Sequence, residues 1–194
     1  MGKRGVVGGV SAAALGFPVK FAYADPPYLG CCGRYQHFHP DGRCWDLLET
    51  HSILVLRLRY EYPHGWALST SSSALKRLLA MDVMPEDVRI GAWVKPFASF
   101  KPNVNPAYAW EPVLFWGGRK RGRYEPTARD WHSESITLKR GLTGAKPKGF
   151  GQWIAEILGV TESDTIDDLF PGTGSVAASW GQGRLAFGQK EAGR

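Results

Sequence analysis

The sequence lacks the residues needed to build a disulfide framework or a membrane span. It has only three cysteines, Cys31, Cys32 and Cys44, and so small and odd a set favours free thiols in a reducing cytoplasm. No segment approaches the ~20 consecutive apolar residues that a transmembrane helix requires. We therefore expect a globular protein without a membrane partner.

The sequence also lacks a Gly-Lys-Ser or Gly-Lys-Thr step, which excludes the phosphate-binding loop of nucleoside triphosphatases. It has an excess of positive charge instead, since 24 Lys and Arg against 18 Asp and Glu leave a net charge of +6. This balance suits a polyanionic partner such as nucleic acid but does not demonstrate one.

The length of 194 residues predicts a single domain, which we place at residues 18–194, because a chain of this size buries a sizeable core. Residues 1–17 are expected to be a flexible lead-in. Their glycine-rich, weakly apolar stretch is followed by Pro18 and Lys20, unlike the apolar region of a signal peptide.

Hydrophobic periodicity predicts alternating strands and helices. Residues 50–62 are ambiguous because their second half alternates as in a strand, but their length favours a helix with Thr50 as its N-cap. Residues 95–107 are expected to be a loop. The other expected elements are strands at 17–23, 65–70, 88–94, 108–116, 165–170 and 185–188, and helices at 73–81, 150–158 and 175–180. This alternation predicts an α/β fold.

Four tryptophans lie in the central part of the chain, at Trp93, Trp110, Trp116 and Trp131. They could form part of the core or a surface on which bases stack. Large aromatic side chains bury much apolar area, so we expect them in the core.

The motif Asp25-Pro26-Pro27-Tyr28 directly follows the first expected strand. Its prolines fix the backbone, so the carbonyl oxygens of the turn point in defined directions. Asp25 supplies a further acceptor, and Tyr28 supplies a flat ring. Acceptors and a stacking ring are what holding the exocyclic amino group of a flipped nucleobase requires. On these four residues alone, an incidental proline turn is an equal alternative.

A second motif, Asp167-Asp168-Leu169-Phe170-Pro171-Gly172-Thr173-Gly174, joins an expected strand to an expected helix. Glycines in such a turn let the backbone approach a ligand closely, and a helix N-terminus adds partial positive charge. Only two of the three Rossmann glycines are present. The segment therefore suggests a nucleotide cradle without specifying its ligand.

Together the two motifs resemble the amino-methyltransferases of DNA, in which an Asp/Asn/Ser-Pro-Pro-aromatic element holds the target amino group and a Phe-x-Gly-x-Gly element holds S-adenosylmethionine. The order of the motifs resembles the circularly permuted β class, over about residues 18–190. Further landmarks of the family are matched by Trp93-Val94-Lys95, by Glu111-Pro112-Val113-Leu114-Phe115 and by Lys146-Pro147.

This resemblance implies a Rossmann-like, S-adenosylmethionine-dependent methyltransferase fold with a mostly parallel central sheet and helices on both faces. It also implies roles for individual residues. Asp25 and the Pro26 carbonyl would accept the amino hydrogens, Pro27 would complete the rigid turn, and Tyr28 would stack on the flipped base. The cofactor pocket would include Lys146, near the methionine end, with Asp168, Phe170, Pro171, Gly172, Thr173 and Gly174.

The implied activity is transfer of a methyl group to an exocyclic amino group, most simply N6 of adenine in DNA. The nitrogen attacks the sulfonium methyl directly, so no covalent intermediate with the protein is required. The sequence has no Pro-Cys dipeptide, the nucleophile motif of cytosine-C5 enzymes, which argues against that class.

A basic cluster, Arg119-Lys120-Arg121-Gly122-Arg123, lies in an expected insertion at residues 117–145, where members of the family carry target recognition. On charge alone, a solvent-exposed loop without a binding function is an alternative. Beside the two motifs, we expect Arg119, Lys120, Arg121 and Arg123 to contact nucleic-acid phosphates.

Two other functions remain open. RNA methyltransferases of the MT-A70-like group share the Asp-Pro-Pro element but usually end it with Trp, so Tyr28 favours DNA. A nucleic-acid-binding relative without catalysis is the other, because the family's acidic ribose ligand falls near Gln189-Lys190 here, with Glu191 one position late.

A zinc site is a further alternative, since the residue types of Cys31, Cys32, His37, His39 and Cys44 are suitable ligands. Their spacing matches no established ligand pattern. We therefore predict no metal.

Overall fold

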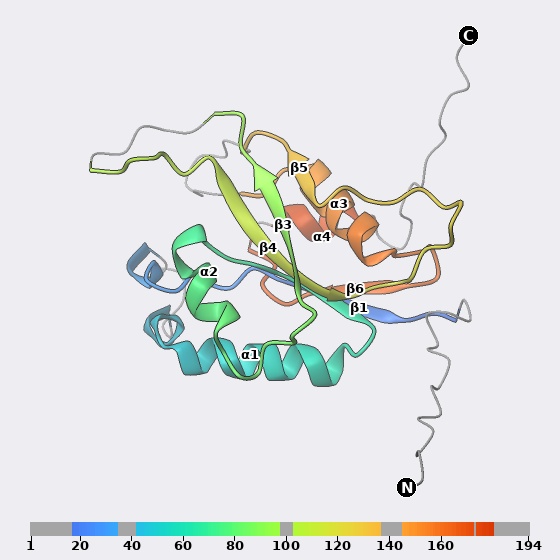
Figure 1. Cartoon of the computed structure of the whole chain (residues 1–194), viewed down its shortest axis with the longest axis horizontal. Helices are drawn as coiled ribbons and strands as arrows, with labels where there is room; N and C mark the ends of the chain where they lie inside the picture. Colours follow the sequence, from blue (N-terminus) through green and yellow to red (C-terminus); the bar gives the residue numbers. More distant parts are fainter. Residues whose placement is uncertain (1–16, 35–41, 98–102, 137–144, 173, 181–194) are drawn as a thin grey trace, which may run out of the picture.

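The computed structural model describes residues 17–34, 42–97, 103–136, 145–172 and 174–180 of the chain. Six strands in this part of the chain form one sheet in the order β5-β3-β4-β2-β1-β6 (Figure 1). The strands are β1 Lys20–Ala24, β2 Gly65–Ser69, β3 Arg89–Val94, β4 Trp110–Gly117, β5 Trp131–Ser133 and β6 Thr165–Asp168. The α/β prediction is confirmed.

The sheet is mostly parallel, as expected. Strand β1 runs parallel to β2 and β6, and β3 runs parallel to β5, whereas β4 is antiparallel to both of its neighbours, β2 and β3. The carboxyl ends of the other five strands therefore meet at one edge of the sheet, together with the amino end of β4. In open α/β sheets this is the edge where ligands bind.

Helices cover both faces of the sheet, which also confirms the expectation. Figure 1 shows α1 (Leu48–Glu61) and α2 (Ser72–Leu79) on one face and α3 (Lys148–Leu158) and α4 (Ser175–Ser179) on the other. Strand β2 is buried along its whole length, because its side chains meet a helical layer on each side.

The amphipathic pattern of α3 is confirmed. Phe150, Trp153, Ile154 and Leu158 are buried against the sheet, and the helix ends at Gly159, whose φ of 67° is left-handed. Glycine adopts this conformation at little cost, which is why it stops helices. This helix holds the segment before it, including Lys146, against the sheet edge.

Three local expectations were wrong. Leu47, not Thr50, is the N-cap of α1, and the Thr50 hydroxyl donates to the carbonyl of Cys44 at 2.6 Å. Trp110 and Trp131 are 38% and 44% exposed, because they lie at the sheet's margins, where helices no longer cover them. Strand β5 was not expected, since three residues are too few to show periodicity.

Several expectations fall outside the described residues. They include residues 1–16 of the expected lead-in, the expected strand at 185–188 and the ribose-binding position near Gln189-Lys190. None of the helices that the structure describes is long and apolar enough to cross a membrane.

Candidate functional site

The Asp-Pro-Pro-Tyr motif lies immediately after β1, at the ligand-binding edge of the sheet. Strand β1 is a central strand, paired with β2 on one side and β6 on the other. Pro26 and Pro27 are buried, whereas Asp25 and Tyr28 are partly exposed. The rigid turn therefore anchors the loop and directs two polar side chains toward the edge of the sheet.

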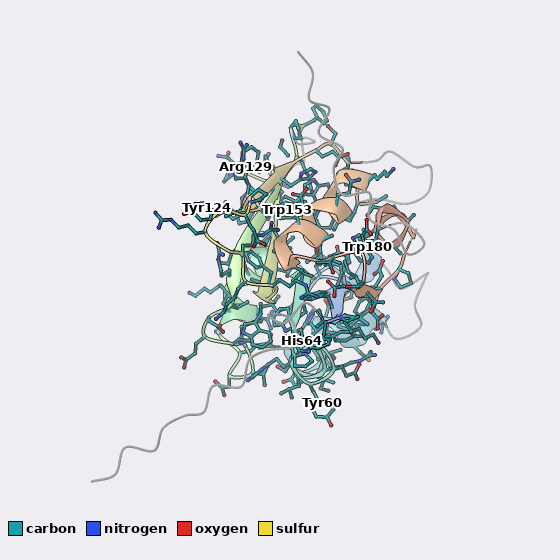
Figure 2. The ribbon with its side chains drawn as sticks, turned by 90° about the vertical axis from the view of Figure 1, so that its right-hand side faces the viewer. Tyr60, His64, Tyr124, Arg129, Trp153 and Trp180 are labelled. Atoms are coloured by element: carbon teal, nitrogen blue, oxygen red, sulfur yellow. The ribbon has the colours of Figure 1, made fainter. Side chains whose placement is uncertain are left out.

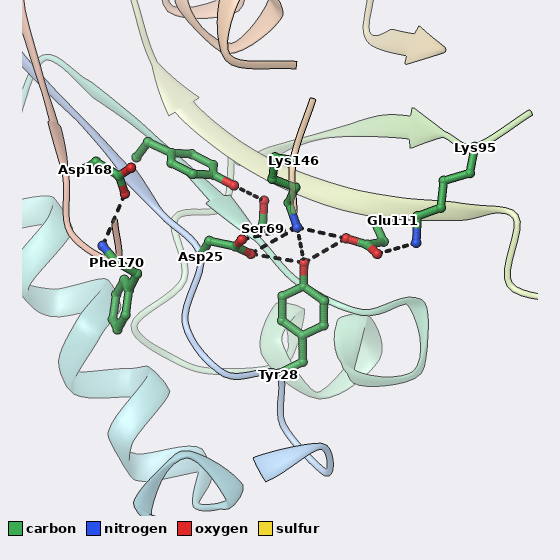
Figure 3. Close-up of polar contacts among 9 residues, drawn as sticks. Asp25, Tyr28, Ser69, Lys95, Glu111, Lys146, Asp168 and Phe170 are labelled. Carbon is green, nitrogen blue, oxygen red and sulfur yellow. Dashed lines mark hydrogen bonds and ion pairs between the residues drawn. The ribbon is translucent and has the colours of Figure 1, made fainter. Parts of the chain in front are cut away.

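Asp25 and Tyr28 belong to a cluster of charged groups with Lys146 and Glu111 (Figure 3). The Lys146 Nζ lies 3.2 Å and 3.3 Å from the two carboxylate oxygens of Asp25. It lies 2.9 Å from the Tyr28 hydroxyl and 3.0 Å from Glu111 Oε2. The other oxygen of Glu111, Oε1, accepts from Lys95 Nζ. Two carboxylates thus alternate with two ammonium groups.

Aromatic rings enclose the Lys146 ammonium. Its Nζ lies 5.1 Å from the ring centroid of Trp93, 5.4 Å from that of Tyr28 and 5.8 Å from that of Phe150. Cations within about 6 Å of such faces are attracted by the ring quadrupole. Only 6% of the side chain is exposed, so two carboxylates and three rings replace the water that this charge would otherwise bind.

The charges set the protonation states in the cluster. Burial disfavours the charged form of Lys146, but Asp25 and Glu111 outweigh it and hold the Lys146 pKa above its usual range. Burial likewise raises the pKa of Glu111, yet Lys146 and Lys95 together lower it to about 2. Burial raises the pKa of Asp25, and Lys146 opposes that shift only in part. Glu111 and Lys146 are therefore charged at neutral pH.

The glycine-rich motif lies after β6, directly beside the first motif. Strands β1 and β6 are paired so that Tyr23 is opposite Asp168, and the Leu169 N–H donates to the Tyr23 carbonyl at 2.9 Å. Motifs at positions 25–28 and 167–174 therefore meet at the carboxyl ends of neighbouring parallel strands. In Figure 3, Phe170 and Asp168 lie on the opposite side of Asp25 from Glu111.

The turn after β6 leaves its backbone open. Gly172 and Gly174 have φ of 48° and 70°, which disfavours other residues there. A Cβ at Gly172 would meet only the Phe170 carbonyl at 3.8 Å, and one at Gly174 would meet nothing within 4 Å. Pro171 is exposed, and Thr173 lies outside the described residues. Helix α4 has five residues, so the turn's own backbone, rather than a helix dipole, offers the contacts.

The two aspartates of this motif have different environments. Asp167 accepts from Lys20 at 2.6 Å and from the Tyr62 hydroxyl at 2.7 Å, contacts that join β6 to β1 and α1. Asp168 accepts from the Phe170 N–H at 3.2 Å and from the Ala177 backbone. Burial, reinforced by the nearby Asp25 charge, raises the pKa of Asp168 to about 6. Asp168 is thus the acidic group of the turn that faces the site.

The basic segment divides into two kinds of residue. Arg119 is only 11% exposed and forms a two-point ion pair with the fully buried Asp164, at 2.6 Å and 3.1 Å. Arg121 donates to the carbonyls of Pro126 and Glu156. Lys120 and Arg123 are exposed, and Tyr124 beside them is 93% exposed (Figure 2). Arg119 and Arg121 thus help to hold the segment in place, and contact of Arg119, Lys120, Arg121 and Arg123 with nucleic acid stays a prediction.

The cysteine-containing loop lies next to the site. Cys32 is buried, its thiol donates weakly to the Tyr28 carbonyl at 3.8 Å, and burial raises its pKa to about 12. Cys31 and Cys44 are also free thiols. His37 and His39 lie outside the described residues, and the residues that the structure describes contain no group of three metal-binding side chains. The absence of zinc stays a prediction.

Sequence reasoning missed the roles of Glu111 and Lys95. Both belonged to landmark segments of the family resemblance, but neither was assigned to the site. The antiparallel direction of β4 brings Glu111, its second residue, to the edge where β1 ends. Trp93 on β3 is paired with Glu111, and Lys95 follows directly. A carboxylate before the apolar run 112–115 was the signal that could have marked this position.

Comparison with known proteins gives a match at the level of fold. No protein-family model and no curated protein matches the chain in sequence. A crystal structure of the M1.HpyAVI–SAM complex superposes with a TM-score of 0.53 and 18% sequence identity, over 87% of this chain and 80% of that one. A crystal structure of M1.HpyAVI matches with a TM-score of 0.45 and 16% identity, over 87% and 77%. The chain shares the fold of M1.HpyAVI.

Proposed function

We propose that the protein transfers a methyl group from S-adenosylmethionine to the exocyclic amino group of a nucleobase, most simply N6 of adenine in DNA. The observation that carries this proposal is the meeting of the two motifs. An acceptor-rich loop after β1 and an open glycine turn after β6, separated by about 140 residues of sequence, lie at the carboxyl ends of adjacent parallel strands. The shared fold with a protein crystallised in complex with SAM supports it.

The turn after β6 suits the cofactor. Its backbone is open at Gly172 and Gly174, and glycine permits the close approach that an adenosyl or amino-acid group needs. Asp168, Phe170, Pro171 and Thr173 complete the proposed pocket, with Lys146 toward the methionine end. When bound, S-adenosylmethionine supplies the methyl group as a sulfonium. The order of the two motifs along the chain does not matter for this pocket, because the pairing of β1 with β6 brings them together.

The loop after β1 suits the target base. Adenine N6 is a poor nucleophile because its lone pair is delocalised into the ring. Acceptance of its two hydrogens by Asp25 and the Pro26 carbonyl favours a more tetrahedral nitrogen and aims its lone pair at the methyl group. Pro27 fixes this turn, and Tyr28 provides a ring on which a flipped base can stack. S-adenosylmethionine held by the turn after β6 would supply the methyl group and leave as the neutral thioether, and the amino nitrogen would release one proton to solvent.

Exposed cations supply the proposed contact with the DNA backbone. Lys120, Arg123 and Arg129 are exposed, and Figure 2 shows Tyr124 and Arg129 on the same side of the molecule. Cations of this kind bind phosphates without reading sequence. The net charge of +6 favours the same polyanionic partner.

The test is mass spectrometry of nucleosides after incubation of the protein with S-adenosylmethionine and unmethylated DNA of mixed sequence, with RNA in parallel. We expect N6-methyladenine in the DNA sample and none without protein. Methylation of RNA alone would change the substrate, and N4-methylcytosine would change the base. Cofactor binding by calorimetry without methylation of either nucleic acid would instead indicate a binding protein that has lost catalysis.

A further inference from the structure

Glu111 contacts the site without belonging to either motif. Its side chain is 17% exposed, and its two oxygens have different partners. Oε1 accepts from Lys95, whereas Oε2 faces Lys146 at 3.0 Å and the Tyr28 hydroxyl at 2.8 Å. A second carboxylate therefore competes with Asp25 for the same donors.

The donors of Lys146 match their acceptors in number. An ammonium group has three N–H donors, and the Lys146 Nζ has three acceptor groups, namely the Asp25 carboxylate, the Tyr28 hydroxyl oxygen and Glu111 Oε2. Because this ammonium is buried, its hydrogen bonds must come from the protein. Glu111 thus accepts a hydrogen bond from Lys146 that Asp25 would otherwise receive.

The hydroxyl proton of Tyr28 is shared in the same way. A hydroxyl donates one hydrogen bond at a time. The Tyr28 oxygen is 2.8 Å from Glu111 Oε2 and 3.1 Å from Asp25 Oδ1, so the shorter contact favours donation to Glu111. Asp25 Oδ1 then keeps a lone pair for another donor.

We propose that Glu111 is a positioning residue, which draws the Tyr28 proton and part of the Lys146 charge away from Asp25 and so keeps Asp25 available to accept the target amino group. This inference rests on the proposed function. Lys95 neutralises the other oxygen of Glu111, which lets the second carboxylate stay charged beside the first. Without Glu111, Lys146 and Asp25 would close into a simple ion pair, and the Tyr28 proton would turn to Asp25.

The charged groups around Asp25 set its pKa, so the proposed role of Glu111 can be tested by the pH dependence of the variants. The groups that face it are Lys146 ahead of α3, Glu111 on β4, Tyr28 in its own loop, Tyr23 on β1 and Asp168 on β6. Burial raises the pKa of Asp25, Lys146 lowers it and the Glu111 charge raises it. Loss of Glu111 should therefore lower the pKa of Asp25, and loss of Lys146 should raise it.

The experiment compares Glu111→Gln and Lys146→Met with the wild type. Initial methylation rates at low DNA concentration are measured from pH 5 upward, with cofactor affinity by calorimetry and thermal unfolding as a check on folding. We expect Glu111→Gln to lower kcat/KM for DNA by about tenfold or more, with little change in cofactor affinity. The acidic limb of its pH–rate profile, where the rate falls as Asp25 is protonated, should move to lower pH. The acidic limb of Lys146→Met should move to higher pH.

Controls separate this role from a structural one. Glu61→Gln removes an exposed carboxylate paired with Arg57 on α1 and should leave both the rate and the limb unchanged. Tyr28→Phe keeps the ring but removes the hydroxyl oxygen that accepts from Lys146. Lys146 should then bind Asp25 more closely, so the rate should fall while DNA affinity stays near normal. If Lys146→Met does not fold, Lys146→Arg is expected to keep the charge and return the limb toward that of the wild type. Acidic limbs that stay in place, or that move in the same direction in Glu111→Gln and Lys146→Met, would overturn the proposal.

A direct titration keeps this inference distinct from the proposed function. Carboxyl-carbon NMR follows the pKa of Asp25 without substrate, with Asp25→Asn identifying its signal. If the wild type methylates neither DNA nor RNA, the proposed function fails. The network still stands if the Asp25 pKa falls in Glu111→Gln and rises in Lys146→Met, and it fails if the pKa is the same in all three proteins.

Discussion

Asp25 is held in place by the protein and still has acceptor positions open to a substrate. Lys146 contacts both of its oxygens, yet a quarter of the side chain remains exposed. A carboxylate has more acceptor positions than these contacts use. It can therefore hold its place through Lys146 and still accept from a substrate that enters from solvent.

Replacement of Asp25 by alanine should leave the fold intact and methyl transfer severely impaired. Lys146 keeps Glu111 and Tyr28 as partners in this variant, so its charge stays compensated. The methylation rate should fall by about two orders of magnitude or more, comparable to the loss of one pre-positioned polar group at a reacting centre. Labelled methyl transfer and cofactor titration measure the two effects. The matched control is Asp82→Ala, an exposed carboxylate at the opposite edge of the sheet, and near-normal transfer by Asp25→Ala would refute the mechanism.

Gly172 tests the cofactor turn. The space around it is open, so the effect of Gly172→Val comes from two sources: its φ of 48° disfavours a β-branched residue, and the new side chain enters the space proposed for the ligand. We expect S-adenosylmethionine binding to be lost in calorimetry. Gly30→Val, at φ of 83° with the same open surroundings, strains a different turn and should retain binding. Equal affinities of wild type and Gly172→Val would remove this turn from the site.

At the scale of elements, the basic segment after β4 contains two kinds of residue. Arg119 joins it to the loop before β6 through Asp164, and its N–H bonds the Leu158 carbonyl at the end of α3. Arg121 bonds the last turn of α3 as well. These contacts fix the segment's path, and Lys120 and Arg123 project from it into solvent. A run of like charges in the sequence thus contains both residues that hold the segment in place and residues that face solvent.

We expect Lys120→Ala combined with Arg123→Ala to weaken DNA binding and to reduce its dependence on salt, because fewer counterions are released on binding. Thermal stability should not change, since both side chains are exposed. Binding isotherms at several salt concentrations measure the slope. By contrast, Arg119→Ala should destabilise the fold by about 1–3 kcal/mol, because Asp164 loses its cation and keeps only the hydrogen bonds from Val19 and Thr161. A salt slope unchanged in the double variant would mean that these two cations face solvent only.

For the whole molecule, the site makes the stability of the fold depend on pH in the acid range. Lys146 and Lys95 outweigh burial and lower the pKa of Glu111 from its ordinary 4.5 to about 2. The unfolded chain therefore binds this proton more readily than the folded one. The stabilisation is complete above pH 4.5 and is lost as the pH falls toward 2. Asp25 has the opposite sign, because its pKa is raised on folding.

We expect the free energy of unfolding, measured with urea between pH 7 and pH 2, to fall as the pH is lowered. Between pH 4.5 and pH 2 it should fall less in Glu111→Gln than in the wild type. The comparison is of pH dependence rather than of absolute stability, since the substitution also removes ion pairs. Glu61→Gln should retain the dependence of the wild type. The same slope in Glu111→Gln and the wild type would show that Glu111 has an ordinary pKa in the folded protein.

The sequence by itself was sufficient for the order of most elements and for the two motifs. Buried parallel strands are apolar runs, and a helix covering a sheet shows a period of 3.6 residues, so residues 65–70 and 150–158 could be assigned locally. The chemistry of Asp25-Pro26-Pro27-Tyr28 is also local, because the prolines fix the turn in which Asp25 and Tyr28 stand.

Only the tertiary structure decided which distant residues share the site. Glu111 reaches Tyr28 because β4 runs against its neighbours, and strand direction is set by pairing across the sheet rather than by local sequence. Arg119 and Lys120 are adjacent and both basic, yet the Arg119 side chain packs against Asp164 and Lys120 faces solvent. The difference arises because contacts with the end of α3 fix the path of this segment. Sequence patterns report what each segment prefers to bury, whereas the charges that balance one another at the site depend on where the whole fold brings them together.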